Sequence, residues 1–252
     1  MYQRRALFQR LSPDVKEFLL IKDKWRESAF CTCLGYLWIA CDSLEGAVDK
    51  IGGVCQEDVS IERSLTQYLV PLIRKAKPAV SPFGVEHGLH EFESLKDAKA
   101  QPPQYDIGFY LLSTPACIWP IEAKVLRTER TVDEYAKSIV DDFTTCRYAP
   151  ITAEGGMLGY LIEGDPAQAL RNVAVKLHCR LRAHPDFKTR NHGFSTHHRQ
   201  VPAGKDYSSR LRCHHMVVLV GNGPTPKRKA LKAGEFCPSD YENRHSQGLR
   251  HP

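Results

Sequence analysis

The sequence predicts an α/β fold in a single domain, with a central mixed sheet flanked by helices. Two patterns indicate it. Apolar residues recur at the spacing of an amphipathic helix within 59–73, a stretch that ends before Pro78. Downstream, 83–94, 105–112 and 117–126 are rich in β-branched and aromatic residues and are separated by proline-rich or small-residue breaks, which is typical of three strands.

A helical segment is expected in front of this core. Ser12 followed by Pro13 favours a helix start, because the serine side chain can accept from free N–H groups and proline fits the first helical position. The helical segment is expected to reach about Asp49. Residues 1–57 should therefore pack as a helical segment on a core that spans 58–221.

Helices and strands alternate behind the third strand. Residues 132–147 favour a helix, 157–163 a strand, and the pair Asp165 and Pro166 opens another helix. The apolar face of that helix is expected to comprise Leu170, Val173, Ala174, Leu177 and Leu181. A last short strand is expected over 215–220.

Two polar stretches show almost no apolar periodicity. Residues 184–212 are rich in His, Arg and Ser and are expected to form a long surface loop. Residues 222–252 carry Pro, Gly and Lys and are expected to form a basic, flexible tail. The basic cluster of this tail has two interpretations, nonspecific affinity for nucleic acid or simple solubility. It comprises Lys227, Arg228, Lys229 and Lys232.

The composition is that of an ordinary globular protein. The 252 residues are 42% hydrophobic and 25% charged, and the formal net charge is +6. This mild excess permits a polyanionic partner but lacks the dense basic character of a histone. The longest apolar stretch, 30–40, is too short for a membrane span, which takes roughly 20 residues.

The nine cysteines are irregularly spaced, and the N-terminus lacks an apolar signal region, so we expect reduced thiols in the cytoplasm. Zinc is an alternative interpretation of two groups of Cys and His. These are Cys31, Cys33, Cys41 and Cys55, and Cys213, His214 and His215 with His197 and His198. Neither group has the C-x₂-C or H-x₃-H spacing that closes a tetrahedron, so buried thiols are favoured.

Charged residues stand inside two of the apolar strands. Asp106 lies within Tyr-Asp-Ile-Gly-Phe, and Glu122 and Lys124 lie within Ile-Glu-Ala-Lys-Val. Because side chains alternate along a strand, Glu122 and Lys124 should project together while their neighbours face the core. If the two strands pair, Asp106 comes within reach, which gives two carboxylates and one amine on one patch. A solvated strand face explains the alternation but not this concentration of charge.

Two carboxylates so close repel each other unless a cation lies between them. Mg²⁺ takes oxygen ligands, retains several waters and suits one or two carboxylates beside a substrate phosphate. Phosphodiester hydrolysis requires an activated water and positive charge against the phosphate oxygens. Lys124 can supply that charge, or orient and help to deprotonate the water. The pattern therefore favours metal-assisted phosphodiester hydrolysis.

An Asp, then a loop, then Glu-x-Lys ending an apolar strand resembles the motif of the PD-(D/E)XK, or restriction-endonuclease-like, nucleases. The resemblance covers about 58–165 and implies a restriction-endonuclease-like core. It implies that Asp106 and Glu122 bind Mg²⁺, with Mn²⁺ as a substitute, and that Lys124 assists catalysis. Tyr105 stands in place of the proline of the family motif, which weakens the specificity of the match without removing a ligand.

Many members of that family add a glutamate from the helix before the sheet. Glu62 fits this position because it shares a helix face with Leu65 and Leu69, and its implied role is metal binding, directly or through water. The helix over 132–147 would support the site, and the glycine-rich run 155–160 looks like the turn and next core strand. The resemblance is to short bacterial members that act in defence against foreign DNA, and many members act as homodimers.

Basic residues behind the triplet are candidates for contacts with DNA phosphates, which bind without reading sequence. They are Arg127, Arg130, Arg147 and Arg171, with Lys176, Arg180 and Arg182, and each could also be an ordinary solvated charge. A group of four residues before Asp106 has two interpretations, an additional ligand or the decoration of an exposed strand. This group is His87, His90, Glu91 and Glu93.

Two other functions fit the sequence. One is a non-catalytic nucleic-acid-binding or regulatory subunit that partners an ATPase or a sensor in a larger defence complex. The intact Asp106, Glu122 and Lys124 argue against it. The other is a scaffold for protein interactions without nucleic-acid contact. The sequence does not distinguish DNA from RNA, or single from double strands, because it contains no known base-reading module.

Overall fold

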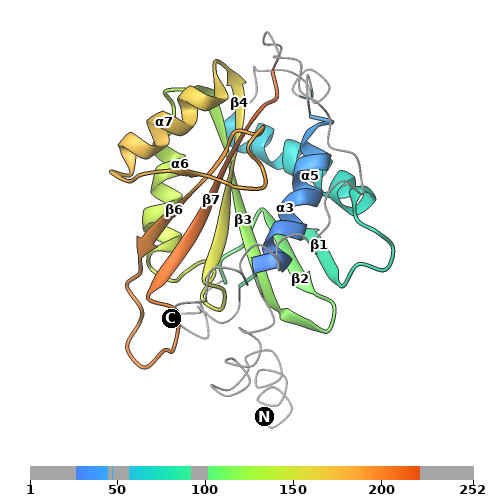
Figure 1. Ribbon diagram of the computed structural model, residues 1–252, viewed down its shortest axis with the longest axis vertical. Helices are drawn as coiled ribbons and strands as arrows, with labels where there is room; N and C mark the ends of the chain where they lie inside the picture. The colour runs from blue at the N-terminus through green and yellow to red at the C-terminus, as the bar shows by residue number, and fades with distance from the viewer. Residues whose placement is uncertain (1–26, 45–46, 48–56, 92–101, 222–252) are drawn as a thin grey trace, which may run out of the picture.

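The computed structural model describes residues 27–44, 47, 57–91 and 102–221 (Figure 1). Within them, helices lie on both faces of a seven-stranded sheet of order β1-β2-β3-β4-β7-β6-β5. The helical elements are α3 (Glu27–Cys41), α5 (Asp58–Ala76), α6 (Asp133–Ser138), the π-helical turn η1 (Ile139–Phe143) and α7 (Pro166–Lys176). The strands are β1 (Phe83–His87), β2 (Ile107–Leu111), β3 (Thr114–Thr128), β4 (Glu154–Glu163), β5 (Arg182–Ala183), β6 (His192–His198) and β7 (Arg210–Leu219). The predicted α/β class with a mixed sheet is confirmed.

The sheet is mixed because its middle is parallel and its two ends are antiparallel. β1, β2 and β3 form an antiparallel meander. β3, β4 and β7 run parallel to one another, and β6 and β5 return antiparallel beyond β7. The parallel neighbours β3 and β4 are joined through α6 and η1, which supply the crossover that parallel pairing requires.

The helices α3 and α5 cover one face of the sheet (Figure 1). Their apolar residues, among them Trp38 and Leu65, share one buried cluster with side chains of β2 and β3. α5 forms over the predicted amphipathic repeat and ends before Pro78, as expected. Val59 and Tyr68 of that repeat are exposed, because only a narrower stripe of the helix meets the sheet.

The elements α6, η1 and α7 cover the opposite face (Figure 1). Tyr135, Phe143 and Val173 pack there in a second buried cluster with Leu126 of β3. The helix predicted over 132–147 ends at Phe143, where its last turn widens into η1. The helix that Asp165 caps is also shorter than its predicted apolar face, because α7 ends at Lys176. Leu170, Ala174 and Leu177 are therefore only half-buried, and Leu181 lies beyond the helix.

Strand boundaries differ from the prediction in three places. β1 ends at His87 instead of reaching 94, and His90 forms only an isolated bridge with Gln104. β3 begins earlier than expected, because it folds back on β2 across a short turn. The glycine-rich run predicted to start as a turn lies within β4, where a side chain on Gly155 would collide with the ring of Phe143.

The prediction of a surface loop over 184–212 is wrong. This stretch contains β6 and the first residues of β7, which pair along their length. Several of its polar side chains are buried, because they have partners on other elements. Arg190 forms a two-pronged ion pair with Asp42 behind α3, and the Ser195 hydroxyl lies 2.7 Å from His215 Nε2. Long-range partners accommodate the buried polar side chains of this stretch, while others, such as those within 202–206, are exposed.

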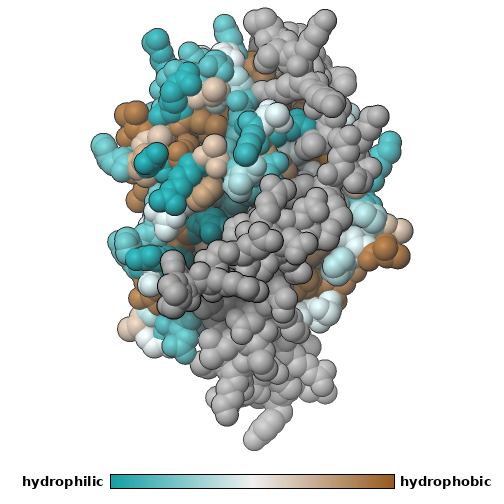
Figure 2. Space-filling view, in the orientation of Figure 1, coloured by the Kyte–Doolittle hydropathy of each residue, from teal (hydrophilic) through white to brown (hydrophobic). Residues whose placement is uncertain are grey.

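Figure 2 shows one face of the molecule, on which apolar atoms gather on the α7 side among hydrophilic ones. A groove of about 510 Å³ beside α7 is lined by the apolar Leu170 and Leu181 and by three arginines, Arg171, Arg180 and Arg182. No described helix is both long and apolar enough to span a membrane.

Several expectations concern residues outside the described ranges. The helix start at Ser12 and Pro13, the extension of the helical segment to Asp49 and the basic tail 222–252 are among them. Cys55 and Glu93 also lie outside. α3 is the described part of the predicted N-terminal helical segment, and its apolar residues belong to the same core cluster as β3.

Candidate active site

The four residues predicted for catalysis and metal binding come together in the structure. They are Glu62, Asp106, Glu122 and Lys124. They meet where β2 leaves β3: the two strands pair until Ile107 lies opposite Ile121. β4, in contrast, stays paired with β3 as far as Thr128. Beyond Ile121, the β2-side edge of β3 therefore has no strand partner within the described residues.

Asp106 occupies the point at which the strand pairing ends. It directly precedes β2, and its Oδ2 accepts a hydrogen bond from the backbone amide of Ala123 at 2.7 Å. The carboxylate thus replaces the backbone of β2 as the partner of this amide. The predicted pairing of the two strands is confirmed, and it places Asp106 directly beside the Glu122 to Lys124 stretch.

The alternation predicted for β3 is present. Ile121, Ala123 and Val125 are buried in the core cluster on the α3 and α5 side. Glu122 and Lys124 meet each other, and the Lys124 ammonium Nζ donates to Glu122 Oε1 at 2.8 Å. Their side chains are only 10% and 18% exposed, so solvent screens this ion pair weakly.

Glu62 reaches the same ammonium group from α5. Lys124 Nζ donates to Glu62 Oε1 at 3.1 Å. Glu62 follows the fully buried Ile61 on the helix, so its side chain starts at the border of the stripe that packs on the sheet. Because the edge of β3 lacks a strand here, α5 can bring a carboxylate directly to Lys124. The sequence expectation that Glu62 belongs with the triplet matches this arrangement.

Burial and mutual repulsion perturb these carboxyl groups. Burial raises the pKa of Glu62 to about 7, with the charge of Lys124 opposing the rise. Burial, followed by the charge of Asp106, raises the pKa of Glu122 to about 8. Burial lowers the pKa of Lys124, but the surrounding carboxylates outweigh it and raise the pKa above its ordinary value. Lys124 therefore remains a cation at neutral pH.

One oxygen of this cluster is available for a further ligand. Among the residues that the structure describes, Glu122 Oε2 is buried without a hydrogen-bond partner. A buried carboxylate oxygen without a partner is costly, and three carboxylates share the single ammonium of Lys124. Hard oxygen donors in this number suit Mg²⁺ or Mn²⁺. The residues present thus fit a divalent cation held by Glu122 and Asp106.

Two residues at the border of the site were missed in the sequence. The charges of Glu122 and of Asp106 act on Tyr148, whose pKa is raised by burial and then by these carboxylates. The pKa of Asp142 is raised by burial, while Arg147 and Lys124 oppose the rise. Asp142 belongs to η1, and π-helical turns recur at functional sites. The only sequence signal for Asp142 was its acidic side chain, late in the helix predicted after Glu122-Ala123-Lys124.

The proposed phosphate-binding arginines divide into paired and exposed side chains. Three form ion pairs: Arg127 with Asp58 at 2.6 Å, Arg147 with Asp142 at 3.2 Å and Arg171 with Asp165 at 3.4 Å. Arg130 is exposed in the turn behind β3. Lys176 pairs with Asp133 at 2.5 Å, while Arg180 and Arg182 are exposed. Arg147 is linked to the site through its partner Asp142, because the charge of Lys124 acts on the pKa of that carboxyl group.

Three of the four residues considered before Asp106 lie within the described ranges, namely His87, His90 and Glu91. Glu91 is buried, and its Oε2 accepts a hydrogen bond from the Tyr105 hydroxyl at 2.6 Å. His90 lies at the isolated bridge to Gln104. His87 ends β1 at the position paired with Ile107. The hydrogen bond from Tyr105 to Glu91 gives this carboxylate a structural role, which favours the interpretation without a ligand.

Within the described residues, the members of the two zinc groups considered in the sequence do not form a metal cluster with one another. Cys33 and Cys41 are buried among apolar residues, as the preference for buried thiols predicts. In the second group, His214 Nε2 contacts Glu154 Oε2 at 2.9 Å. His215 contacts Ser195 instead, and burial lowers its pKa to about 3. His215 is therefore a neutral part of the polar core.

Comparison with family models, with curated proteins and with solved structures finds no match.

Proposed function

We propose that this protein is a nuclease with a restriction-endonuclease-like core, which uses a divalent metal ion to hydrolyse phosphodiester bonds in DNA. One observation carries the proposal. Glu62, Asp106, Glu122 and Lys124 converge at the edge of β3 that β2 leaves uncovered, and Glu122 Oε2 is buried there without a partner. A solvated strand face would need neither the burial nor the contribution from α5.

The carboxylates would hold the metal ion. Asp106 and Glu122 supply hard oxygen ligands, and Glu62 would contribute directly or through water. A bound Mg²⁺ supplies Lewis acidity toward the phosphate and lowers the pKa of a bound water. Asp106 is fixed by the Ala123 amide, so one ligand is positioned before any ion binds. This rigidity favours a constant geometry around the phosphate.

Lys124 and Glu62 have separate roles in the proposed reaction. Lys124 is held protonated by its carboxylate neighbours, so it stabilises negative charge on the phosphate and does not remove a proton from water. Glu62, with a pKa of about 7, can accept a proton from water near neutral pH. Of the two roles that the sequence left open for Lys124, the charge role is therefore the one supported.

The nature of the substrate is inferred from charge and from the resemblance. The net charge of +6 and the exposed Arg130 favour a polyanion. DNA, a cytoplasmic role in defence against foreign DNA, and action as a homodimer follow from the similarity of the motif to that of PD-(D/E)XK nucleases. A partner ATPase or sensor belongs to the alternative of a non-catalytic subunit, which the intact cluster disfavours.

Cleavage assays on plasmid DNA, single-stranded DNA and RNA test the proposal. The protein is incubated with Mg²⁺, Mn²⁺ or EDTA, beside Asp106→Asn, Lys124→Met and the control Lys137→Met, whose side chain is 62% exposed on α6. We expect metal-dependent cleavage of DNA by the wild type and the control only. Cleavage that persists in EDTA and in both site variants contradicts the proposal. Binding of DNA without cleavage under every metal condition favours the regulatory subunit.

A further inference from the structure

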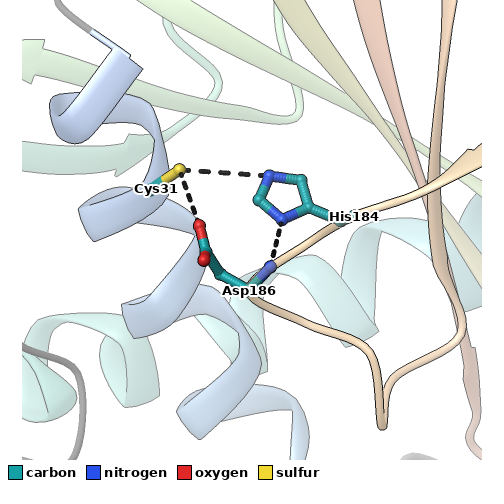
Figure 3. Close-up of side chains that lie close together, drawn as sticks. All are labelled: Cys31, His184 and Asp186. Atoms are coloured by element: carbon teal, nitrogen blue, oxygen red, sulfur yellow. Dashed lines mark hydrogen bonds between the residues drawn. The ribbon is translucent and has the colours of Figure 1, made fainter. Parts of the chain in front are cut away.

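A second cluster of ligand-type side chains lies away from the carboxylates, between α3 and the turn that joins β5 to β6 (Figure 3). Cys31 projects from α3 toward His184 and Asp186. Its Sγ lies 3.9 Å from His184 Nε2 and 3.7 Å from Asp186 Oδ2. All three potential ligand atoms lie within 4.8 Å of one another. More than 150 residues of sequence separate Cys31 from its two neighbours.

These distances resemble the edges of a tetrahedral metal site. With metal–sulfur bonds of about 2.3 Å and metal–nitrogen or metal–oxygen bonds of about 2.1 Å, ligand atoms stand about 3.6 Å apart. Both distances from Cys31 Sγ lie within a few tenths of an ångström of that value. The imidazole and carboxylate atoms need to approach by about 1.4 Å at most, and the side chain of Asp186 that would move is exposed.

The imidazole of His184 is held in place by rings packed around it. His192 stacks on it with a centroid distance of 4.7 Å and an interplanar angle of 26°. Phe187 packs against it at 4.8 Å. Cys31 and His184 are 3% and 5% exposed, so two of the three donors are fixed inside the protein. Such positioning before binding is what a metal site requires of its ligands.

We infer that Cys31, His184 and Asp186 bind one transition-metal ion of the zinc type. Thiolate and imidazole donors favour Zn²⁺ over the hard cations Mg²⁺ and Ca²⁺, which take oxygen ligands. Three protein ligands leave the fourth position of the tetrahedron to water, on the side where Asp186 is exposed. The ion would join α3 to the β5–β6 turn.

Binding of the ion displaces protons from the cluster. Without metal, Cys31 Sγ donates toward Asp186 Oδ2, and His184 Nδ1 accepts a long hydrogen bond from the Asp186 amide at 3.3 Å. The ion replaces the thiol proton, which leaves as H⁺ to solvent. The His184 ring stays neutral, and its proton moves from Nε2 to Nδ1 when Nε2 binds the ion. Nδ1 can then no longer accept, so the weak hydrogen bond from the Asp186 amide is lost. The sulfur, one ring nitrogen and one carboxylate oxygen become ligands.

Titration of the full chain with Co²⁺, followed by displacement with Zn²⁺, tests this site. Thiolate coordination of Co²⁺ produces a sulfur-to-metal charge-transfer band that carboxylate sites cannot give. We expect one equivalent of Co²⁺ to produce this band in the wild type, and Zn²⁺ to abolish it. Cys31→Ser should remove the band, and Asp186→Asn should weaken Co²⁺ binding by at least about tenfold.

Two controls separate this site from the rest of the molecule. Cys33→Ala alters a buried thiol on the same helix and should keep the band. Asp106→Asn alters the proposed nuclease site and should also keep it, so failure of the nuclease proposal leaves this test intact. A folded wild type without the band, or a band that persists in Cys31→Ser, overturns the inference. If Cys31→Ser does not fold, unchanged Co²⁺ affinity in Asp186→Asn, whose side chain is exposed, overturns it as well.

Discussion

The carboxylate of Asp106 accepts a hydrogen bond from the backbone amide of Ala123 at 2.7 Å. This bond stands at the place where the pairing of β2 with β3 ends. It ties the first proposed metal ligand to the strand that carries the other two charged groups. Asp106 thus has a structural contact and a proposed chemical role, and different substitutions can separate them.

Asp106→Asn should keep the fold and lose cleavage. The side-chain oxygen of asparagine can still accept the hydrogen bond from the Ala123 amide. A neutral amide is a weaker metal ligand than a carboxylate, so asparagine disfavours a divalent ion at this position. Asp106→Ala should lose both, with a cost of about 1–3 kcal/mol in the free energy of unfolding. Urea denaturation and plasmid cleavage measure the two effects. Cleavage by Asp106→Asn at the wild-type rate would exclude this residue as a ligand.

The protein should become less stable as the pH rises from about 7 to 9 in the absence of divalent ions. The pKa values of Glu62 and Glu122 in the folded protein are raised to about 7 and about 8, above the ordinary value of 4.5. The buried histidines, whose pKa values are lowered from the ordinary 6.5, oppose this effect only below that pH. Above it the folded state binds more protons than the unfolded state, and stability falls with increasing pH. The raised pKa of Lys124 changes the stability only above about pH 10.5, its ordinary value, so Lys124 does not contribute in this pH window.

Glutamine variants test the origin of this pH dependence. The loss of stability in the wild type between pH 7 and 9 should be on the order of 2 kcal/mol, and it should shrink markedly in Glu62→Gln with Glu122→Gln. Added Mg²⁺ should restore stability more at pH 9 than at pH 7, because it binds the ionised carboxylates. Denaturant unfolding at both pH values measures each change. An unchanged slope in the double variant means that other groups cause the dependence.

Asp42→Ala should destabilise the protein by about 2–4 kcal/mol. The Arg190 side chain is 2% exposed, packs over the Trp38 ring at 5.4 Å and depends on Asp42 for its ion pair. Removal of the carboxylate leaves a buried guanidinium charge without its counterion. Glu134→Ala is the control, because its pair with Lys137 is exposed and should contribute less than about 1 kcal/mol. Equal thermal shifts for both variants would contradict this assignment.

Arg130→Ala should weaken DNA binding without changing cleavage at saturating protein. An exposed arginine that contacts one phosphate contributes about one unit to the slope of log affinity against log salt. Fluorescence anisotropy with labelled duplex DNA at several salt concentrations measures this slope. Lys205→Ala, from the loop between β6 and β7, is a control with the same change of charge. A slope that falls equally in both variants would remove Arg130 from the proposed contact surface.

Local patterns were sufficient to predict that Glu62, Asp106, Glu122 and Lys124 come together. The alternation of Glu122 and Lys124 with apolar neighbours determined which side chains share a face of β3, and pairing with the strand of Asp106 followed from their order in the chain. The charge of Glu62 within an apolar repeat indicated a partner at the sheet. The pKa values and the orphaned oxygen of Glu122 were not predictable, because they depend on burial by residues distant in sequence.

The second half of the sheet was misjudged for a physical reason. Histidine, arginine and serine are usually solvated, so 184–212 resembled a loop. In the structure, Trp38 Nε1 donates to His192 Nδ1, and Arg190 meets Asp42. Both partners come from α3 or its end, about 150 residues earlier in the chain. Such pairings leave no local periodicity, and for the same reason the contact of Cys31 with His184 was not visible in the sequence.

The most direct test of the proposed nuclease is single-turnover cleavage of a labelled DNA duplex in Mg²⁺, with Lys124→Met compared with the wild type at saturating protein. Because Lys124 is the only cation in contact with Glu62 and Glu122 among the described residues, its charge has no substitute there. We expect a rate reduced by at least about a hundredfold, with DNA affinity nearly unchanged. Cleavage by Lys124→Met at the wild-type rate would contradict the account.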